Sequence, residues 1–448
     1  MDSTFSPGRL CPTHRAVLRP ARRAAALAIV MLAYSHIAPA QTAASLTIDD
    51  AVQLAAVQSR RVAAAQAQAL AARETAVAAR QPPDPVLRAG IANLPVDGAD
   101  RFSLTRDFMT MRSLGLMQEL TRTDKLNARA ERALREADVA GTAGHQALAD
   151  AQRDAALAWL ERSFQQSARE LLLAQVAQAE LQVQAAEALY RGNKGPLADV
   201  FGARSQVEQL RDRVAQTERD AMLATTRLGR WIGADAARPA AARPEFALPA
   251  WTDADLGHAL AAHPQIAAAY QQEALASAEA DLARAEARGD WSVELMFSQR
   301  GPSYSNMVSI NFSLPLAWQR SMRQDREIAA RQALVARSRA ERDDVQRAHE
   351  AEVRGMLQEW RSHASRLQRF DAQLIPLAQA RAEASLSAYR GGNGALAAVL
   401  DARRAEVELH LDRLRLESDI GRLWAQLAFL IPHPAGSIPH PAAPRSPP

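Results

Sequence analysis

Two stretches of this 448-residue chain decide how it folds. Residues 190–210 read YRGNKGPLADVFGARSQVEQL, and residues 389–409 read YRGGNGALAAVLDARRAEVEL. At a constant offset of 199 they are identical at 10 of 21 positions without a gap. Similarity at a fixed period is typical of internal duplication. Each Tyr-Arg pair is followed by glycines, which predict a tight turn between two helices. These turn glycines are Gly192, Gly195, Gly391, Gly392 and Gly394.

The repeat extends over nearly the whole chain. We expect one copy at residues 41–233 and a second at residues 251–432, with a Pro- and Ala-rich linker at residues 234–250 between them. In each copy the residues predict a helix, two strands, a very long helix, the glycine turn and a returning helix. The predicted fold class is therefore mainly α with a small contribution from strands.

Each glycine turn joins two long helices. The helical hairpins are predicted at about residues 121–231 and 319–430, which are rich in Ala, Leu, Glu, Gln and Arg. At ~1.5 Å per residue, a first arm of roughly 70 residues would extend on the order of 100 Å. Apolar residues such as Leu160 and Phe164 recur at the spacing of a coiled-coil seam. Pro376 should bend the second long helix near its far end, because proline cannot donate the helical hydrogen bond.

Two short strands precede each hairpin. In the second copy they are predicted at about residues 291–299 and 307–316, where apolar and polar residues alternate. The strands of the first copy, at about residues 86–94 and 101–118, alternate less regularly. A period of two with one apolar face is typical of strands in a membrane barrel. Four strands are too few to close such a barrel, so we expect a homotrimer with a 12-stranded outer-membrane β-barrel, continued by a periplasmic α-helical barrel.

The N-terminal residues have the features of a secretory signal peptide. A cluster of arginines precedes an apolar run at residues 24–34, and the small residues at 38–40 before Gln41 have the form of a signal-peptidase site. The apolar run is shorter than the roughly 20 residues that a membrane-spanning helix needs. We therefore expect residues 1–40 to be removed on secretion.

Removal of this segment changes the charge balance. The whole chain has 54 Lys and Arg against 50 Asp and Glu, but residues 1–40 hold five Arg and one acid, so the mature chain has 49 of each sign. A net charge of zero gives no electrostatic argument for nucleic-acid binding. The only cysteine, Cys11, lies in the expected signal peptide, so we expect no disulfide in the mature protein.

The duplicated plan, the strand placement and the turn motif resemble the TolC-type outer-membrane efflux family. The motif is Tyr389-Arg390-Gly391-Gly392, followed by Leu396, Val399, Leu400, Asp401 and Ala402. This resemblance implies a homotrimer in the outer membrane of a Gram-negative bacterium, in contact with its lipid, with a tunnel that crosses the periplasm. It implies docking to a periplasmic adaptor (membrane fusion) protein and to an inner-membrane pump of the resistance-nodulation-division type. The chain would then be the passive exit duct for small solutes in a tripartite efflux system.

The resemblance also implies roles for residues at the turns. In the family, acidic side chains just past the turn ring the closed entrance, and the tyrosine of the turn helps to hold it shut. Here these positions are Asp401 and Tyr389, with Asp199 and Tyr190 as their counterparts in the first copy, and the turn glycines would form the tip for adaptor docking. A second acid often precedes the first by three residues in the family, whereas this chain has Ala398. Three carboxylates at a constriction would attract cations. The alternative is that both aspartates only cap or solvate helices.

A methionine-containing segment resembles the branch of the family that serves heavy-metal efflux. The resemblance lies in residues 93–98 and 107–112. Met109, Met111 and Met117 share odd parity, so in an unbroken strand they would face the lumen. Thioethers suit soft ions such as copper(I) or silver(I), which makes these three residues candidate metal ligands. The alternative is that methionine fills space in an irregular strand.

No catalytic residue set is recognisable, so we expect neither enzymatic activity nor a cofactor. The Pro-rich tail at residues 433–448 is expected to be disordered, with His433 and His440 in it. The alternative to an efflux duct is a soluble periplasmic coiled-coil adaptor or scaffold. A soluble scaffold has no use for a lipid-sized apolar strand face, and recovery in the outer-membrane fraction would separate the two. The transported substrate does not follow from the sequence, because a passive tunnel takes its specificity from its pump.

Overall fold

The computed structural model describes residues 45–246 and 260–430. The predicted signal peptide at residues 1–40 and the predicted tail at residues 433–448 lie outside them, as does the end of the predicted linker, residues 247–250. Across the described residues, none of the helices combines the length and the apolar composition that a membrane-spanning helix requires.

The first copy begins with a helix whose start is fixed by a side-chain cap. At the start of α2 (Ile48–Gln58), Thr47 Oγ1 accepts a hydrogen bond from Asp50 N at 3.0 Å, and Asp50 Oδ2 accepts one from Thr47 N at 3.1 Å. This capping box satisfies backbone donors that a helix start leaves free. The further elements of this copy are α3 (Arg60–Ala79), β1 (Val86–Ala92), β2 (Met111–Leu120), α4 (Thr123–Arg191), α5 (Leu197–Ile232) and the 3-10 helix η1 (Gly233–Ala237).

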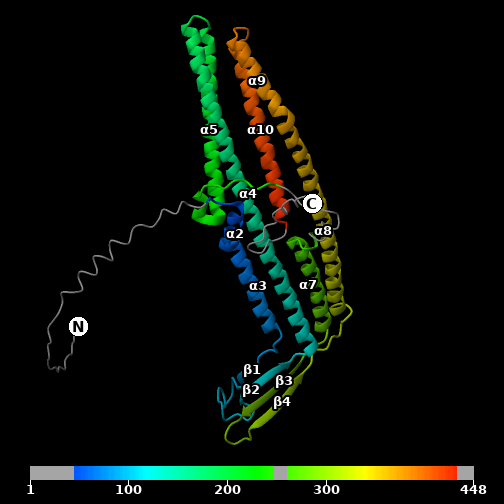
Figure 1. Cartoon of the computed structure of the whole chain (residues 1–448). Coiled ribbons are helices and arrows are strands. Elements are labelled where there is room, and N and C mark those ends of the chain that lie inside the picture. Colours follow the sequence, from blue (N-terminus) through cyan, green and yellow to red (C-terminus); the bar gives the residue numbers. More distant parts are fainter. Residues whose placement is uncertain (1–44, 247–259, 431–448) are drawn as a thin grey trace, which may run out of the picture. The chain divides into compact units, whose positions relative to one another are not determined.

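The second copy repeats this order. At the offset of 199, α5 and α10 begin at equivalent residues, Leu197 and Leu396. Figure 1 shows the sheet at one end of the long helices and the α4–α5 and α9–α10 turns at the other. The elements of this copy are α7 (Pro264–Glu286), β3 (Trp291–Gln299), β4 (Met307–Ser313), α8 (Gln324–Arg369), the π-helical turn η2 (Phe370–Leu374), α9 (Ile375–Arg390) and α10 (Leu396–Ala428).

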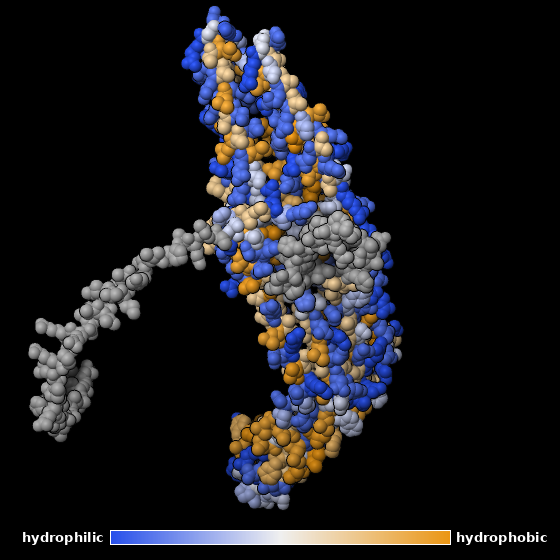
Figure 2. Space-filling model, in the orientation of Figure 1, coloured by the Kyte–Doolittle hydropathy of each residue, from blue (hydrophilic) through white to orange (hydrophobic). Residues whose placement is uncertain are grey.

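The four strands form one antiparallel sheet in the order β1-β2-β3-β4, in which the β2–β3 pairing joins the two copies. Its register places apolar residues in rows across the strands. Because successive side chains point to opposite faces, these rows share one face, which we call the apolar sheet face. The hydrophobic side chains gathered over the sheet in Figure 2 belong to this end of the molecule. The two longest rows are Leu87, Leu116, Leu295 and Ile310, and Ala89, Leu114, Phe297 and Val308.

The second strand is shorter than the sequence predicted. We expected a strand at residues 101–118, but β2 begins at Met111. In the preceding loop, Asp107 Oδ2 accepts hydrogen bonds from Met109 N and Thr110 N, both at 2.9 Å, and Phe102 has a φ of 54°. Such local bonds compete with the strand ladder, and a left-handed residue cannot lie in a strand. Local hydrogen bonds and a left-handed residue therefore prevent a strand in this segment, although its sequence pattern predicted one.

The first arms of the two hairpins differ. α4 runs unbroken over 69 residues, whereas the helix predicted from residue 319 begins at Gln324 and is interrupted by η2. In η2, Ile375 N donates to Phe370 O, five residues back, instead of four. Pro376 follows directly. Proline lacks an N–H and crowds the carbonyl four residues before it, which gives a physical reason for the wider turn at this point.

Several buried contacts join the two copies, among them an apolar cluster and an ion pair. The largest apolar cluster joins α2, α4, α5 and α10 around Trp159, whose Nε1 donates to Leu46 O at 3.0 Å. Next to the sheet, Lys125 of α4 and Asp290 just before β3 form an ion pair at 2.5 Å, with only 7% and 10% of their side chains exposed. A charge pair this well buried fixes the relative position of the helices and the sheet, because separating the partners would leave a charge without compensation.

Candidate functional site

The two glycine turns have the same backbone hydrogen bonds. In each, the residue after the helix C-cap donates to the carbonyl three residues back, at 3.0 and 3.1 Å, and the next residue donates to the carbonyl five residues back, at 2.8 and 2.9 Å. This is the Schellman motif, which satisfies the last carbonyls of a helix. Its left-handed residue is Asn193 (φ 56°) after α4 and Gly392 (φ 78°) after α9. Sequence reasoning named the glycines but missed Asn193, although Asn is the residue that most readily replaces Gly in this conformation.

Two other turn glycines are required by close packing. A Cβ atom on Gly394 would lie 3.0 Å from Tyr389 N and 3.1 Å from Ala388 C. On Gly195 it would lie 3.3 Å from Leu189 Cβ. The returning helix in each hairpin therefore starts directly against the end of the first arm, and a side chain at Gly394 would force the backbone apart.

The ends of the two hairpins pack against each other. One apolar cluster combines residues of α4 and α5 with residues of α9 and α10, so the turns of the two copies form a single packed tip. Gly202 of α5 also lies close to Leu400 of α10. We call this cluster the tip cluster. Its buried members are Ala186, Val200, Ala203, Leu396 and Val399, with Val183, Leu386, Tyr389 and Leu400 packed against them.

At the tip, a tyrosine of one copy faces an aspartate of the other. Tyr389 at the end of α9 is half-buried, and burial together with the negative charge of Asp199 raises the pKa of its phenol. Asp199 lies in the first turn of α5, where the helix dipole favours a carboxylate. The structure thus brings together two of the four residues that the sequence singled out. Tyr190 is 47% exposed, and Asp401 lies on the exposed side of α10.

Asp199 is not the positional counterpart of Asp401. The offset of 199 equates Asp199 with Ala398, and Asp401 with Gly202. Asp199 therefore occupies the first turn of its helix, whereas Asp401 lies beyond the first turn of α10, too far along to cap it. Each copy has one acid near the start of the returning helix, at two different positions. Ala398 stands three residues before Asp401, where the family resemblance places a second acid, and its equivalent in the first copy is Asp199.

The face of the sheet opposite the apolar sheet face is polar. We call it the polar sheet face. Arg88 Nη1 lies 3.3 Å from Glu294 Oε1, and Arg88 Nη2 donates to Met117 Sδ at 3.1 Å. Met111 and Met117 lie on this face as expected from their parity, but Met109 precedes β2 and lies in the loop. Two methionines that the sequence analysis did not single out, Met296 and Met307, share the face.

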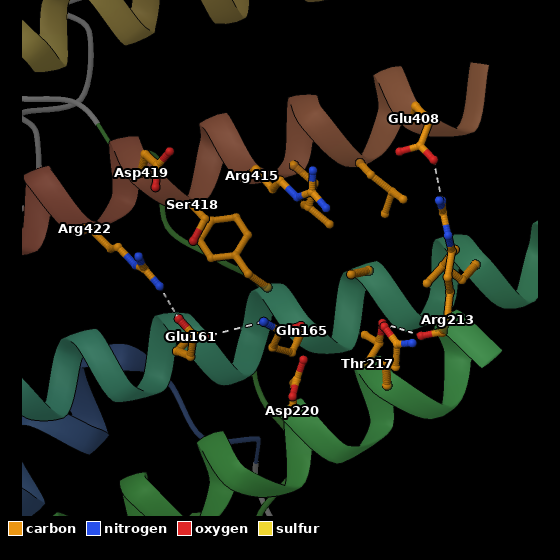
Figure 3. A pocket seen from close by; sticks show the side chains of 16 residues that line it. Glu161, Gln165, Arg213, Thr217, Asp220, Glu408, Arg415, Ser418, Asp419 and Arg422 are labelled. Atoms are coloured by element: carbon orange, nitrogen blue, oxygen red, sulfur yellow. Dashed lines mark hydrogen bonds and ion pairs between the residues drawn. The ribbon is translucent and has the colours of Figure 1, made fainter. Parts of the chain in front are cut away.

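A groove of about 510 Å³ runs between α5 and α10 with α4 as its floor. Figure 3 shows its ends, where an ion pair joins Arg213 to Glu408 at 2.5 Å and another joins Arg422 to Glu161. The lining has four acids and three arginines beside amide, hydroxyl and apolar side chains, so its charges nearly balance. Across the described ranges, no three His, Cys, Asp or Glu side chains gather as a metal site.

Comparisons with known proteins show which fold this is. No protein-family model matches the chain, and no curated protein matches its sequence. The solved outer-membrane channel OprN is similar with a TM-score of 0.71 and 18% identity, over 86% of this chain and 89% of OprN. The outer-membrane protein VceC from Vibrio cholerae is similar with a TM-score of 0.71 and 17% identity, over 86% and 95%. CusC, described for its transmembrane channel formation, is similar with a TM-score of 0.73 and 15% identity, over 85% and 91%. At these identities the similarity establishes a common fold.

Proposed function

We propose that this chain, which has the fold of the solved outer-membrane channels, is the outer-membrane exit duct of a tripartite efflux system. The observation that carries the proposal is the sheet. Four strands present an exposed apolar face in continuous rows, and a polar face behind it. An exposed apolar band on strands, with polar residues on the reverse, is what a barrel wall between lipid and a water-filled lumen requires.

The proposed assembly is a homotrimer. In the described part of the chain, β1 and β4 each pair with one neighbour only, so both are edges of the sheet. Unpaired edge groups are costly in a bilayer, where no water can bond them. Three copies joined edge to edge would give a closed barrel of twelve strands, and the long hairpins would continue it as a helical tunnel through the periplasm.

The proposed entrance is the tip at the other end of the hairpins. Tyr389 and Asp199 would hold the two hairpins together there, and Asp401, exposed on α10, would line the constriction. The turn glycines, which keep the tip narrow, would form the docking surface for a periplasmic adaptor protein, which in turn links the duct to an inner-membrane pump of the resistance-nodulation-division type. Solutes would then pass through the duct passively, and the pump would supply the energy for their export.

The cargo proposed is small solutes, with heavy-metal cations as one class. Thioethers of Met111, Met117, Met296 and Met307 on the polar sheet face support that class, because they are soft ligands. The guanidinium of Arg88 donates to Met117 Sδ, so it competes with a cation for this sulfur. We therefore assign cargo selection to the pump, and expect Met117→Leu to leave metal export in cells unchanged.

Membrane fractionation and planar-bilayer recording test the duct. The trimer should be recovered from the outer-membrane fraction with detergent and should form ion-conducting pores in a planar bilayer. A freely soluble periplasmic monomer would instead support the scaffold alternative, and the duct would be wrong.

A substitution at the entrance tests its selectivity. Asp401→Ala should reduce the preference of the pore for cations and its block by divalent cations, because a ring of carboxylates attracts positive charge at a constriction. The matched control is Asp412→Ala, which removes an acid from the same helix about three turns further from the tip. Equal selectivity in wild type and Asp401→Ala would remove Asp401 from the entrance.

A further inference from the structure

A cavity of about 490 Å³ lies where the sheet meets the helices. It is formed by the end of α7, the connection from β4 to α8 and the start of α8, which come together beside the sheet in Figure 1. Gly289 lets two of these segments touch, because a Cβ atom there would lie 2.6 Å from Pro315 Cγ. The apolar part of the cavity wall consists of Ala283, Ala287, Pro315, Leu316 and Ala317.

Exposed apolar side chains continue from the sheet to this cavity. The apolar sheet face ends beside the helices at the pair of Leu120 with Trp291, which are both about half exposed. After β4, Leu316, Trp318 and Met322 are 63%, 86% and 71% exposed. Tryptophan is enriched at the level where lipid headgroups meet hydrocarbon. Under the proposed function, this surface lies at the periplasmic edge of the bilayer, and the cavity lies at the level of the headgroups.

One arginine of the cavity has no acidic partner. Arg323 forms no ion pair with any residue in the described ranges, whereas Arg320 beside it lies 3.2 Å from Asp325. One turn further along α8, Glu327 pairs with Arg331 at 3.0 Å. A glutamate that precedes a cation by four residues is better oriented in a helix than one that follows it. The guanidinium of Arg323 is therefore available to an anion from outside the chain.

The same cavity also presents negative charge. Glu286 at the end of α7 and Glu327 on α8 both line it. Glu286 lies 3.9 Å from Arg129 Nε, which is too far for a hydrogen bond. Gln324 lines the cavity too, and its Oε1 is enclosed without a hydrogen-bond donor. A molecule that matches these groups has an anion for the arginine and a hydrogen-bond-donating cation for the acceptors.

We infer that this cavity binds the headgroup of a phospholipid of the periplasmic leaflet, and that phosphatidylethanolamine is the lipid that fits it. Its phosphate would accept hydrogen bonds from Arg323, and its ammonium group would donate to the carboxylates of Glu286 and Glu327. The acyl chains would lie along Leu316 and Trp318 toward the apolar sheet face. Phosphatidylcholine has no N–H to donate, and the headgroup of phosphatidylglycerol has no cation for the two carboxylates.

The place of the site in a membrane rests on the proposed function, whereas lipid binding can be measured on the purified protein. Native mass spectrometry in detergent would use dioleoyl phosphatidylethanolamine, phosphatidylcholine and phosphatidylglycerol, which share their acyl chains. Wild type should bind the ethanolamine lipid about tenfold more tightly than the other two. Arg323→Gln should weaken binding of the ethanolamine lipid by about tenfold, because a charge-assisted contact with the phosphate is lost.

The matched control is Arg326→Gln, which removes an arginine of the same helix that does not line the cavity. It should bind all three lipids as wild type does. Glu286→Gln should bring the affinity for the ethanolamine lipid toward that for the choline lipid, because the ammonium group loses a charged acceptor. Ala283→Leu keeps a good helix former in α7 and fills the cavity, so it should weaken binding of all three lipids.

Two results would overturn the site: equal binding of the ethanolamine lipid by Arg323→Gln and Arg326→Gln, or equal affinity of wild type for the three lipids. Free phosphoethanolamine has the same charges without acyl chains and should compete only weakly. If it bound as tightly as the lipid, a lipid would be excluded as the occupant. Selective lipid binding by a protein that forms no pores would keep the site and reject the duct. Pores without selective binding would keep the duct and reject the site.

Discussion

At the scale of single residues, the two glycine turns use different amino acids at the one position that needs a left-handed backbone conformation. Both turns need one left-handed residue between the hairpin arms, and the chain uses Asn193 in one copy and Gly392 in the other. Glycine adopts this conformation without strain, and asparagine does so at low cost, whereas other residues lose about 1 kcal/mol or more. The internal repeat is thus a comparison of two residues at one position, with the same backbone hydrogen bonds around them.

This comparison predicts the effect of substitution at Gly392. Gly392→Asn should be nearly neutral, and Gly392→Val should destabilise the α9–α10 turn by about 1–2 kcal/mol, because a β-branched residue is strained at positive φ. Hydrogen exchange at the Asn393 amide, which donates to Ala388 O, reports this loss. As a control, Gly391→Ala should have little effect, since Gly391 has a φ of −75°. An Asn variant as unstable as the Val variant would contradict the prediction.

At the scale of secondary-structure elements, α7 begins at a buried histidine, His263, that lies against a partly buried one, His349. His263 is the N-cap of α7, and its Nδ1 accepts a hydrogen bond from Gln265 N at 3.3 Å. Its ring lies 4.4 Å from the ring of His349 on α8. Burial, followed by the proximity of His349, lowers the pKa of His263 to about 4, with Asp150 and Arg153 of α4 acting in opposite directions. Glu352 Oε2 lies 3.4 Å from Nδ1 of His349.

This histidine predicts acid sensitivity of the α7 junction. The pKa of His263 is lower in the folded chain than in the unfolded chain, so the unfolded state binds more protons between about pH 6.5 and pH 4. Stability should therefore fall through this window as the pH drops, by up to about 3 kcal/mol. Thermal unfolding at pH 7 and pH 4.5 measures the loss. His263→Asn keeps an N-cap acceptor and should reduce the loss, whereas His145→Asn, at an exposed position on α4, should not. Equal acid sensitivity in wild type and His263→Asn would exclude His263 as the source.

At the scale of the whole molecule, the proposed function depends on the two faces of the sheet being different. The apolar sheet face includes Phe312, which is 68% exposed, and the neighbouring residue Asn311 points to the polar sheet face and bonds Glu294. A one-residue shift in register would exchange the two faces. The antiparallel pairing of β2 with β3 sets this register between the copies, and the Lys125–Asp290 ion pair anchors it to the helices.

Adjacent substitutions in β4 test the assignment of the faces. Under the proposed function, Phe312→Asp places a charge in lipid, which costs about 2–4 kcal/mol or somewhat less for an acid, and should reduce the amount of trimer in the outer membrane. Asn311→Asp adds the same charge one residue away, on the lumen side, and should assemble normally. Quantitative immunoblotting of outer-membrane fractions compares the two. Equal assembly of both variants would mean that the face of Phe312 does not meet lipid.

The sequence by itself determined the features that local patterns encode. The fixed offset of 199 showed the duplication, the helix-forming composition showed the hairpins, and the period-two alternation at residues 291–299 coincides with β3. The same pattern gave a wrong prediction at residues 101–110, which form a loop. The hydrogen bonds of Asp107 and the positive φ of Phe102 shape this loop, and a pattern of alternating residues does not reveal them. Met109 was placed on the lumen face for this reason, and the loop removes it from the strand.

Only the tertiary structure decided which residues of the two copies meet. Asp199 and Tyr389 are 190 residues apart in the chain, and Asp371 and Arg413 lie on opposite arms of a hairpin. Their partnership depends on how helices rotate about their axes when buried side chains pack, and that rotation is a property of the whole core. A repeat in sequence gives equivalent positions. Packing then makes those positions different, with an apolar seam in one hairpin and an ion-paired wide turn in the other.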